Sequence, residues 1–112
     1  MNVPFEIDVR EAASGEIVVV QLSGEFDLAG VELFTETVIS GLSQDSHKEM
    51  VFDLSGLAFL DSSGLNGLIR AMKEATTRGA RFTVYKPSGA VSRLFELVRA
   101  TDFLELREDL PD

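Results

Sequence analysis

Apolar and charged residues alternate strictly at the start of the chain. The apolar positions are Phe5, Ile7 and Val9, and a charged residue follows each of them. This period of two predicts a half-exposed strand at the edge of a sheet. A continuous apolar run, Ile17–Val20, predicts a second and more central strand. The turn-forming segment between the two strands is short, so we expect an antiparallel hairpin that closes at Gly24–Asp27.

The middle of the chain changes to a helical period. Apolar residues spaced three and four apart predict one helix over about residues 28–42. A polar connector, Ser43–Lys48, then leads to the apolar run Met50–Phe52, which is typical of a strand buried on both faces. The helical period returns and stops at Arg78-Gly79, where glycine favours a helix end. The inner positions of the two helices are Val31, Phe34, Val38 and Leu42, and then Leu65, Leu68, Ile69, Met72 and Ala75.

Three further elements complete the pattern. We expect a strand at about Phe82–Tyr85 and a short strand or packed segment at about Phe103–Leu106. Between them we expect a helix of about eleven residues, marked by Val91, Leu94, Phe95 and Val98. Residues 107–112 are mostly charged, and we expect a frayed tail there. The order of elements predicts an α/β fold with a mixed, mostly parallel sheet that opens with an antiparallel hairpin and has helices packed on it. A chain of 112 residues fits a single domain.

The net charge of the chain limits which classes of partner can bind it directly. The formal net charge is −9, so nucleic acid and anionic membranes are disfavoured as direct partners. The charge either meets a basic patch on another protein or only keeps the domain soluble. The chain has no cysteine, an acidic start unlike a signal peptide, and no apolar run close to the ~20 residues of a membrane helix. These features indicate a cytoplasmic protein.

Candidate chemistry gathers where the central strand passes into the second helix. Asp61, Ser62, Ser63 and Gly64 stand at this junction. Helix starts carry unpaired N–H groups and partial positive charge, so an anion is stabilised there. Capping by aspartate or serine explains one of these side chains. Only one residue can be the N-cap, and the other hydroxyl is free to face solvent.

Enzymatic roles for these residues fit poorly. A hydrolase elbow reads G-x-S-x-G, but residue 60 is leucine, and the only histidine, His47, lies in another loop, where we expect it to be solvated. Asp27 and Asp61 could meet at one end of the sheet, yet two carboxylates alone are a poor Mg²⁺ site. Phosphate-cradling glycine motifs are absent. We therefore expect no enzymatic activity, no cofactor and no resident metal.

The remaining role is that of a serine that is acted upon. An exposed Ser62 could accept a phosphoryl group, which would add about −1.5 to −2 charges near pH 7. The helix start would stabilise this anion by ~0.3–1 kcal/mol. A partner docked over Ser62 would have to desolvate the phosphate, and Asp61 would add repulsion. The pattern therefore predicts a phosphorylation-controlled binding switch.

Three motifs together resemble a known family. Asp61-Ser62-Ser63-Gly64-Leu65 after an apolar strand resembles the signature of STAS domains, specifically of bacterial anti-sigma factor antagonists. Gly24-Glu25-Phe26-Asp27 is similar to a second motif of that family, and the segment Ser88–Phe95 is similar to a third. The three motifs occur in the family's order and at its spacing, and they span nearly the whole chain.

The resemblance implies a function and a set of residues. It implies that the chain binds an anti-sigma factor serine kinase and so releases a sigma factor. The kinase would phosphorylate Ser62 and end the binding, and a phosphatase would restore it. We expect the chain to be a monomer or a weak dimer. The partner-binding residues that it implies are Asp27, Asp61, Ser62, Ser63, Gly64 and Asn66.

A second reading stays open within the same family. Related domains serve as binding modules in stress-sensing assemblies, in lipid-transport machinery or in anion transporters, without phosphorylation. A serine at position 62 favours the phosphorylation switch over members without a hydroxyl there. The fold alone does not separate these functions.

Overall fold

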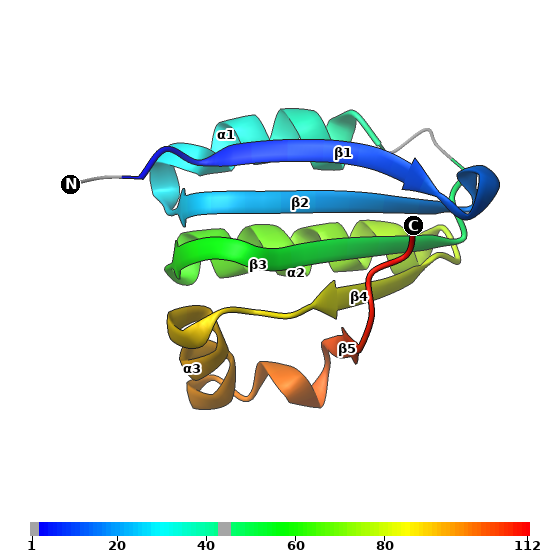
Figure 1. Ribbon diagram of the computed structural model, residues 1–112. Coiled ribbons are helices and arrows are strands. Elements are labelled where there is room, and N and C mark those ends of the chain that lie inside the picture. Colours follow the sequence, from blue (N-terminus) through cyan, green and yellow to red (C-terminus); the bar gives the residue numbers. More distant parts are fainter. Residues whose placement is uncertain (1–2, 43–45) are drawn as a thin grey trace.

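Five strands form a single sheet in the order β1-β2-β3-β4-β5 (Figure 1). The structure is a computed structural model and describes residues 3–42 and 46–112. β1 and β2 are antiparallel, and the remaining neighbours are parallel. This arrangement confirms the predicted mixed, mostly parallel sheet with an opening hairpin. The strands are β1 (Glu6–Ala12), β2 (Ile17–Phe26), β3 (Glu49–Leu60), β4 (Arg81–Tyr85) and β5 (Glu105–Arg107).

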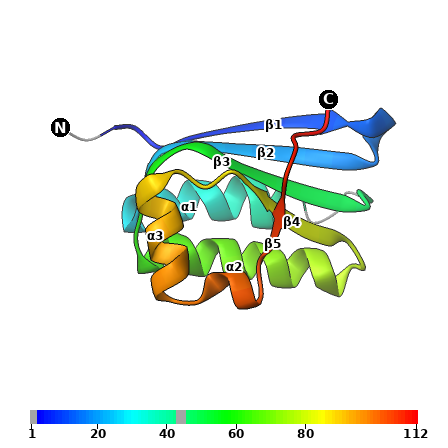
Figure 2. The ribbon, with the colours of Figure 1, turned by 60° about the horizontal axis from the view of Figure 1, so that its bottom comes forward.

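The α-helices of the described chain all lie on one face of the sheet (Figure 2). They are α1 (Val31–Phe34), which continues as a π-helical turn η3 (Thr35–Ser40), α2 (Ser62–Thr77) and α3 (Gly89–Leu97). Short 3₁₀ turns are η1 (Ala13–Gly15), η2 (Leu28–Gly30) and η4 (Ala100–Asp102). The single helix predicted over residues 28–42 is therefore a succession of three helical types. Its predicted inner residues Phe34, Val38 and Leu42 are nevertheless buried.

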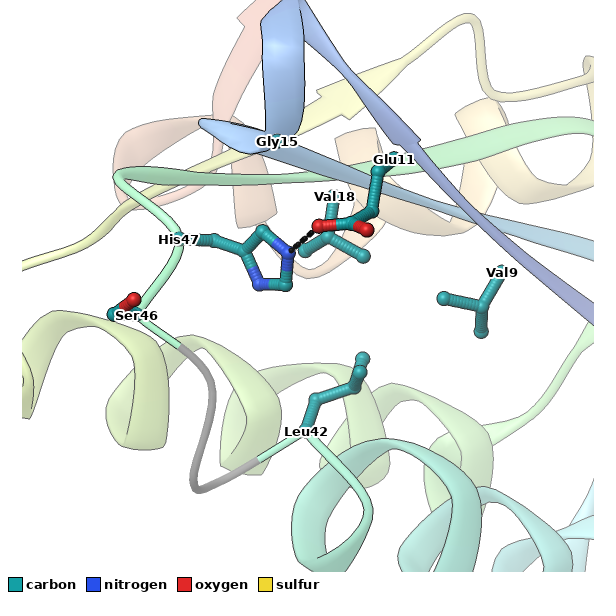
Figure 3. A pocket seen from close by; sticks show the side chains of 7 residues that line it. All are labelled: Val9, Glu11, Gly15, Val18, Leu42, Ser46 and His47. Atoms are coloured by element: carbon teal, nitrogen blue, oxygen red, sulfur yellow. Dashed lines mark hydrogen bonds and ion pairs between the residues drawn. The ribbon is translucent and has the colours of Figure 1, made fainter.

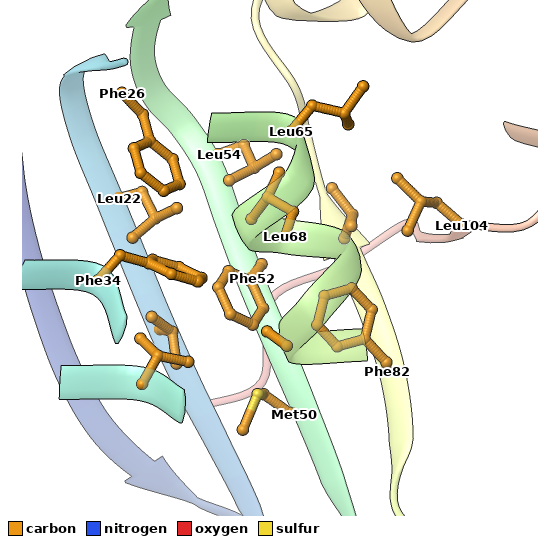
Figure 4. Close-up of a cluster of buried hydrophobic side chains, with 14 of the residues drawn as sticks. Leu22, Phe26, Phe34, Met50, Phe52, Leu54, Leu65, Leu68, Phe82 and Leu104 are labelled. Carbon is orange, nitrogen blue, oxygen red and sulfur yellow. The ribbon is translucent and has the colours of Figure 1, made fainter. Parts of the chain in front are cut away.

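The main core lies between the sheet and the helices, and Figure 4 shows its central part. A row of aromatic rings crosses it from β2 to β4. Phe26 and Phe34 have ring centroids 4.9 Å apart, Phe34 and Phe52 are 5.9 Å apart, and Phe52 and Phe82 are 4.9 Å apart. Phe5 stacks on Phe26 at 4.4 Å and so anchors the segment before β1. Such contacts fix the helices at a set distance from the strands.

Among the described residues, no helix covers the opposite face of the sheet, but this face is not bare. A small cluster of Ala12, Val19 and Val51 is buried there, with Leu110 packed against it. Val51 is fully buried, so β3 is covered on both faces as the apolar run predicts, although the C-terminal segment and not a helix supplies the second cover. Figure 1 shows this segment crossing the strands.

The C-terminal segment differs from the frayed tail that the sequence led us to expect. The guanidinium of Arg10 donates to the carbonyl oxygen of Pro111 at 2.8 Å. Arg107 belongs to β5, and its Nη1 donates to the Asp109 carboxylate at 2.6 Å. The segment is held because Leu110 finds apolar surface on a sheet face that the helices leave uncovered.

Two other boundaries depend on tertiary contacts. β3 continues well past the apolar run to Leu60. It can do so because it stays paired with β2, through two irregularities in the register, after β4 has ended. α2 ends as predicted at Arg78-Gly79, where Gly79 has φ +83° and the Ala80 N–H donates to the carbonyl of Ala75 at 2.9 Å. Part of the predicted polar connector, residues 43–45, lies outside the described residues.

Candidate functional site

The candidate site forms where β2 and β3 end side by side. Phe26 pairs with Leu60 in the parallel ladder, and the Asp61 N–H donates to the carbonyl of Phe26 at 3.3 Å. Asp27 and Asp61 are the next residues on the two strands. The sheet therefore places the two carboxylate residues of the family motifs at one end of the molecule.

Both aspartates cap a helical element. The Asp61 carboxylate accepts from the N–H of Gly64 at 3.0 Å and is the N-cap of α2. The Asp27 carboxylate accepts from the N–H of Ala29 at 3.0 Å and caps η2. Each carboxylate satisfies an N–H group that has no partner within its helix. Their positions are therefore fixed by the backbone.

Ser62 is the first residue of α2, and it is exposed. Its hydroxyl makes no hydrogen bond within the described part of the chain. Asp61 serves as the cap, so the hydroxyl of Ser62 is not needed to close the helix. Ser63 is half-buried and Asn66, one turn further along α2, is exposed. An enzyme approaching this end of the molecule thus reaches Ser62 more easily than Ser63.

Gly64 is buried and faces the sheet. A Cβ atom at this position would lie 2.4 Å from the carbonyl oxygen of Phe26. Gly67, one turn later, is also buried, and a Cβ there would lie 3.0 Å from the ring of Phe26. The two glycines let the start of α2 lie directly on the end of β2, which sets the position of Ser62. Sequence reasoning missed Gly67, although its spacing of three from Gly64 was a signal.

Two exposed apolar residues lie close in sequence to these aspartates, and sequence reasoning did not find them. Leu28, next to Asp27, is 73% exposed, and Phe59, two residues before Asp61, is 45% exposed. Phe59 pairs with Glu25 across the β2–β3 ladder. We call Asp27, Leu28, Phe59, Asp61, Ser62 and Asn66 the Ser62 surface.

The fixed charges of the Ser62 surface are negative. Asp27 and Asp61 belong to it, and the first basic residue of α2 is Arg70, two turns after Ser62. A phosphate on Ser62 would thus find helix N–H groups but no arginine or lysine within the first turns of α2. Helix N–H groups and the helix dipole can hold such an anion without a cation.

A separate hollow of about 370 Å³ lies at the other end of the sheet (Figure 3). It contains His47, whose Nε2 lies 3.0 Å from the Glu11 carboxylate. The His47 side chain is only 11% exposed, so the prediction of a solvated histidine is wrong. The chain returning to β3 brings His47 under β1, where Glu11 provides an acceptor. His47 is therefore too far from Ser62 along the sheet to serve as its base.

The described residues hold neither a metal-binding cluster nor a membrane-spanning helix. They contain no group of three or more histidine, cysteine, aspartate or glutamate residues that could hold a metal ion. None of the helices in residues 3–42 and 46–112 is both long and apolar enough to span a bilayer.

Comparison with known proteins decides the family. A family profile described as the STAS domain matches residues 8–112. The chain belongs to the STAS domain family. The match covers β2, β3 and α2, and so includes all the residues of the Ser62 surface.

Several relatives and solved structures are similar to this STAS domain. An anti-sigma F factor antagonist of Lysinibacillus sphaericus is 29% identical over 86 residues, which are 77% of this chain and 74% of that protein. A crystal structure of an anti-sigma factor antagonist from Mycobacterium paratuberculosis has a TM-score of 0.82 and 23% identity, covering 96% of this chain and 88% of the other. The Bacillus cell fate determinant SpoIIAA in its phosphorylated form has a TM-score of 0.69 and 22% identity, covering 95% and 93% of the two chains.

Proposed function

We propose that this STAS domain is an anti-sigma factor antagonist controlled by phosphorylation at Ser62. It binds an anti-sigma factor serine kinase, which releases the sigma factor, and the bound kinase phosphorylates Ser62 and ends the complex. A phosphatase that acts on phospho-Ser62 restores binding. The observation that carries the proposal is the exposed Ser62 hydroxyl, unpaired within the described residues, on a helix start already capped by Asp61.

The fold supports a change of charge at this position without a change of structure. Asp61, and not Ser62, accepts the N–H of Gly64, so modifying Ser62 leaves the helix cap in place. The phosphate would sit in the partial positive field of α2, which contributes ~0.3–1 kcal/mol. The folded domain is therefore expected to tolerate phosphorylation.

Binding of the kinase, in contrast, is expected to be weakened by phosphorylation of Ser62. Phosphorylation adds about −1.5 to −2 charges beside the carboxylates of Asp27 and Asp61. A kinase surface that fits the unmodified, acidic site would bury this additional charge without a matching cation. A mismatched buried charge at an interface costs ~2–5 kcal/mol, which is about 30-fold to several-thousand-fold in affinity.

The relatives' names agree with this proposal. The curated relative is named an anti-sigma F factor antagonist, and one structural neighbour is described in a phosphorylated form. The proposed role is binding and not catalysis, because His47, the one histidine of the chain, lies at the opposite end of the sheet from Ser62 and bonds Glu11. The proposal includes a cytoplasmic location, since a partner that controls a sigma factor works where transcription takes place.

The proposed binding residues divide by role. Asp27, Asp61, Ser62 and Asn66 form the contact surface, together with the apolar Leu28 and Phe59. Ser63 is a half-buried neighbour, and Gly64 acts by keeping α2 close to β2. Leu28 and Phe59 supply the apolar area that a mainly acidic surface otherwise lacks.

The direct test is phosphorylation by the candidate anti-sigma factor kinase with ATP, with the site located by mass spectrometry. Phosphate is expected on Ser62. The matched variants Ser62→Ala and Ser63→Ala should respectively abolish and preserve the modification. Phosphate on Ser63 alone, or none, would contradict the switch and favour a STAS binding module without phosphorylation.

Binding measurements separate charge from folding. Ser62→Ala should bind the kinase as tightly as the wild type but should not be released by ATP. Ser62→Asp should bind at least about tenfold more weakly, the effect of about 1.4 kcal/mol, and both variants should unfold at the wild-type temperature. Equal affinities for Ser62→Asp and Ser62→Ala would refute the electrostatic explanation.

A further inference from the structure

The sheet ends on one side at β5, a strand of three residues that has no neighbour beyond it among residues 3–42 and 46–112. Its outer N–H and C=O groups are therefore open to another strand. Exposed strand edges invite pairing, and proteins usually protect them with charge. Both edge strands of this sheet carry charged residues, but β1 has a net negative charge and β5 is neutral.

Exposed apolar residues recur along the part of the chain that leads into β5. Leu97 is 82% exposed, Phe103 47% and Leu106 50%. Val98 is 42% exposed and lies directly after α3. Figure 2 shows the chain from α3 through η4 into β5 on the helix-covered side of the sheet. We call Leu97, Val98, Phe103 and β5 the β5 edge. Gathered exposed apolar side chains beside a free strand edge are a feature of protein interfaces.

The charge of this region is balanced, unlike that of the chain. Residues 93–107 contain three arginines and three acidic residues, whereas the whole chain has a net charge of −9. Two copies of so acidic a protein repel each other over most orientations. They meet without net repulsion where the β5 edge of one faces the β5 edge of the other.

The sequence of β5 is complementary to itself. It reads Glu105-Leu106-Arg107. In an antiparallel pair centred on Leu106, the two leucines face each other and each Glu105 lies opposite the other copy's Arg107. Opposite charges across neighbouring strands stabilise a sheet, and like charges destabilise it. A two-fold contact of this kind uses the same patch on both subunits.

The charges of β5 are already organised within one protomer. Glu105 is paired with Arg81, and Arg107 lies 3.1 Å from the Glu49 carboxylate. The two-fold pairing would join these pairs into one network and would not leave a charge without a partner. On the other edge, β1 carries three acidic residues and one arginine, so pairing two β1 strands would bring net negative charge together.

We propose that the β5 edge is the self-association surface of this protein, with antiparallel pairing of two β5 strands centred on Leu106. The occupant is a second copy of the chain, and the two sheets become continuous across the two-fold axis. The β5 edge is separate from the Ser62 surface. The proposal does not depend on the proposed function, and its test needs neither kinase nor phosphate.

The first test measures self-association by sedimentation as a function of protein concentration. Wild type is expected to show a reversible monomer–dimer equilibrium, and Leu106→Lys is expected to raise the dissociation constant at least about tenfold. Leu28→Lys is the matched control, because Leu28 is also exposed but lies beside Asp27. A wild type that stays monomeric, or equal effects of the two substitutions, would overturn the proposal.

The second test uses the absence of cysteine from the chain. Residues directly opposite in antiparallel strands have Cα atoms about 4.5–5.5 Å apart, within the range that a disulfide spans. Leu106→Cys should therefore form a disulfide-linked dimer under mild oxidation much faster than Val9→Cys, which places the thiol at the centre of β1. The cross-linking experiment tests the pairing of two β5 strands even if the Leu106→Lys variant folds poorly. Equal rates, or faster linking through position 9, would reject the β5 edge.

Discussion

Gly64 shows how a single missing side chain positions the site. It allows the first turn of α2 to touch the Phe26 backbone, since a Cβ would lie 2.4 Å from the Phe26 oxygen. Atoms this close must move apart, and the neighbour here is backbone that β2 holds in place. The location of Ser62 relative to Asp27 therefore depends on Gly64.

Gly64→Ala should reduce the free energy of unfolding by ~1–3 kcal/mol through overpacking. The measurement is denaturant unfolding of the Gly64→Ala variant, with Gly89→Ala as the control variant. A Cβ at Gly89 would meet only the Arg93 side chain, at 3.7 Å, so this control should be nearly neutral. Equal stability of the two variants would mean that the close approach of α2 to β2 is not required.

At the scale of elements, polar contacts connect β3, β4 and β5 on the face without helices. The Thr83 hydroxyl donates to the buried Glu49 carboxylate at 2.7 Å, and Arg107 donates to the same carboxylate at 3.1 Å. Glu49 is only 7% exposed. A buried carboxylate needs such partners, because burial without them is strongly unfavourable. The short β5 is therefore held by charge as well as by its ladder with β4.

Arg107→Ala should lower the free energy of unfolding by about 3 kcal/mol, because it leaves the Glu49 charge buried without its cation. Arg99→Ala provides the control. Arg99 pairs with Asp102 at the surface, where both side chains are well exposed, and such pairs contribute about 0–1 kcal/mol. A loss for Arg107→Ala no larger than for Arg99→Ala would show that Glu49 is satisfied without β5.

The pair of Arg81 and Glu105 gives the β4–β5 contact a dependence on pH. Hydrogen bonding to the Arg81 guanidinium lowers the pKa of Glu105 below its ordinary value, against the opposing effect of burial. A carboxylate with a lowered folded-state pKa stabilises the fold above its unfolded pKa, and this contribution disappears as pH falls through the folded pKa.

Arg81→Gln should therefore be slightly less stable than wild type at neutral pH, and the difference should shrink on acidification below the ordinary glutamate pKa of about 4.3. Urea unfolding at a series of pH values measures this difference. The effect is small because both side chains are largely exposed. A difference that is constant with pH would assign the Arg81 effect to packing.

At the scale of the whole molecule, charge is distributed unequally along the chain and across the sheet. Eight of the ten lysines and arginines lie between residues 70 and 107, whereas 12 of the 19 acidic residues precede residue 70. Because the strands follow the sheet in chain order, β1, β2 and β3 form an acidic side and β4 and β5 a more basic one. The Ser62 surface lies at the end of the acidic side.

This distribution should steer a basic partner towards the Ser62 surface. The association rate constant with the proposed anti-sigma factor kinase should fall as ionic strength rises, while the dissociation rate changes much less. Stopped-flow binding over a range of salt concentrations measures both. An association rate that does not respond to salt would show that the acidic side has no role in recognition and serves solubility alone.

Local patterns in the sequence determined the elements and the junction that carries the site. The alternation at Phe5–Val9, the apolar run at Met50–Phe52 and the helical spacing from Leu65 were sufficient, because periodicity records which face of an element is buried. The Asp61-Ser62 motif likewise identified the start of α2. The sequence left open which residue caps α2. The structure shows that Asp61 is the cap, which leaves the Ser62 hydroxyl free.

Tertiary structure alone decided the features that join distant residues. The packing of Leu110 against the cluster on the helix-free face, the pairing of His47 with Glu11 and the exposure of Leu28 and Phe59 have no periodic signal. Each depends on which surfaces remain uncovered after the strands and helices have assembled. A linear pattern reports the buried face of its own element, whereas the partner of that face, and the residues left in solvent, are properties of the assembled chain.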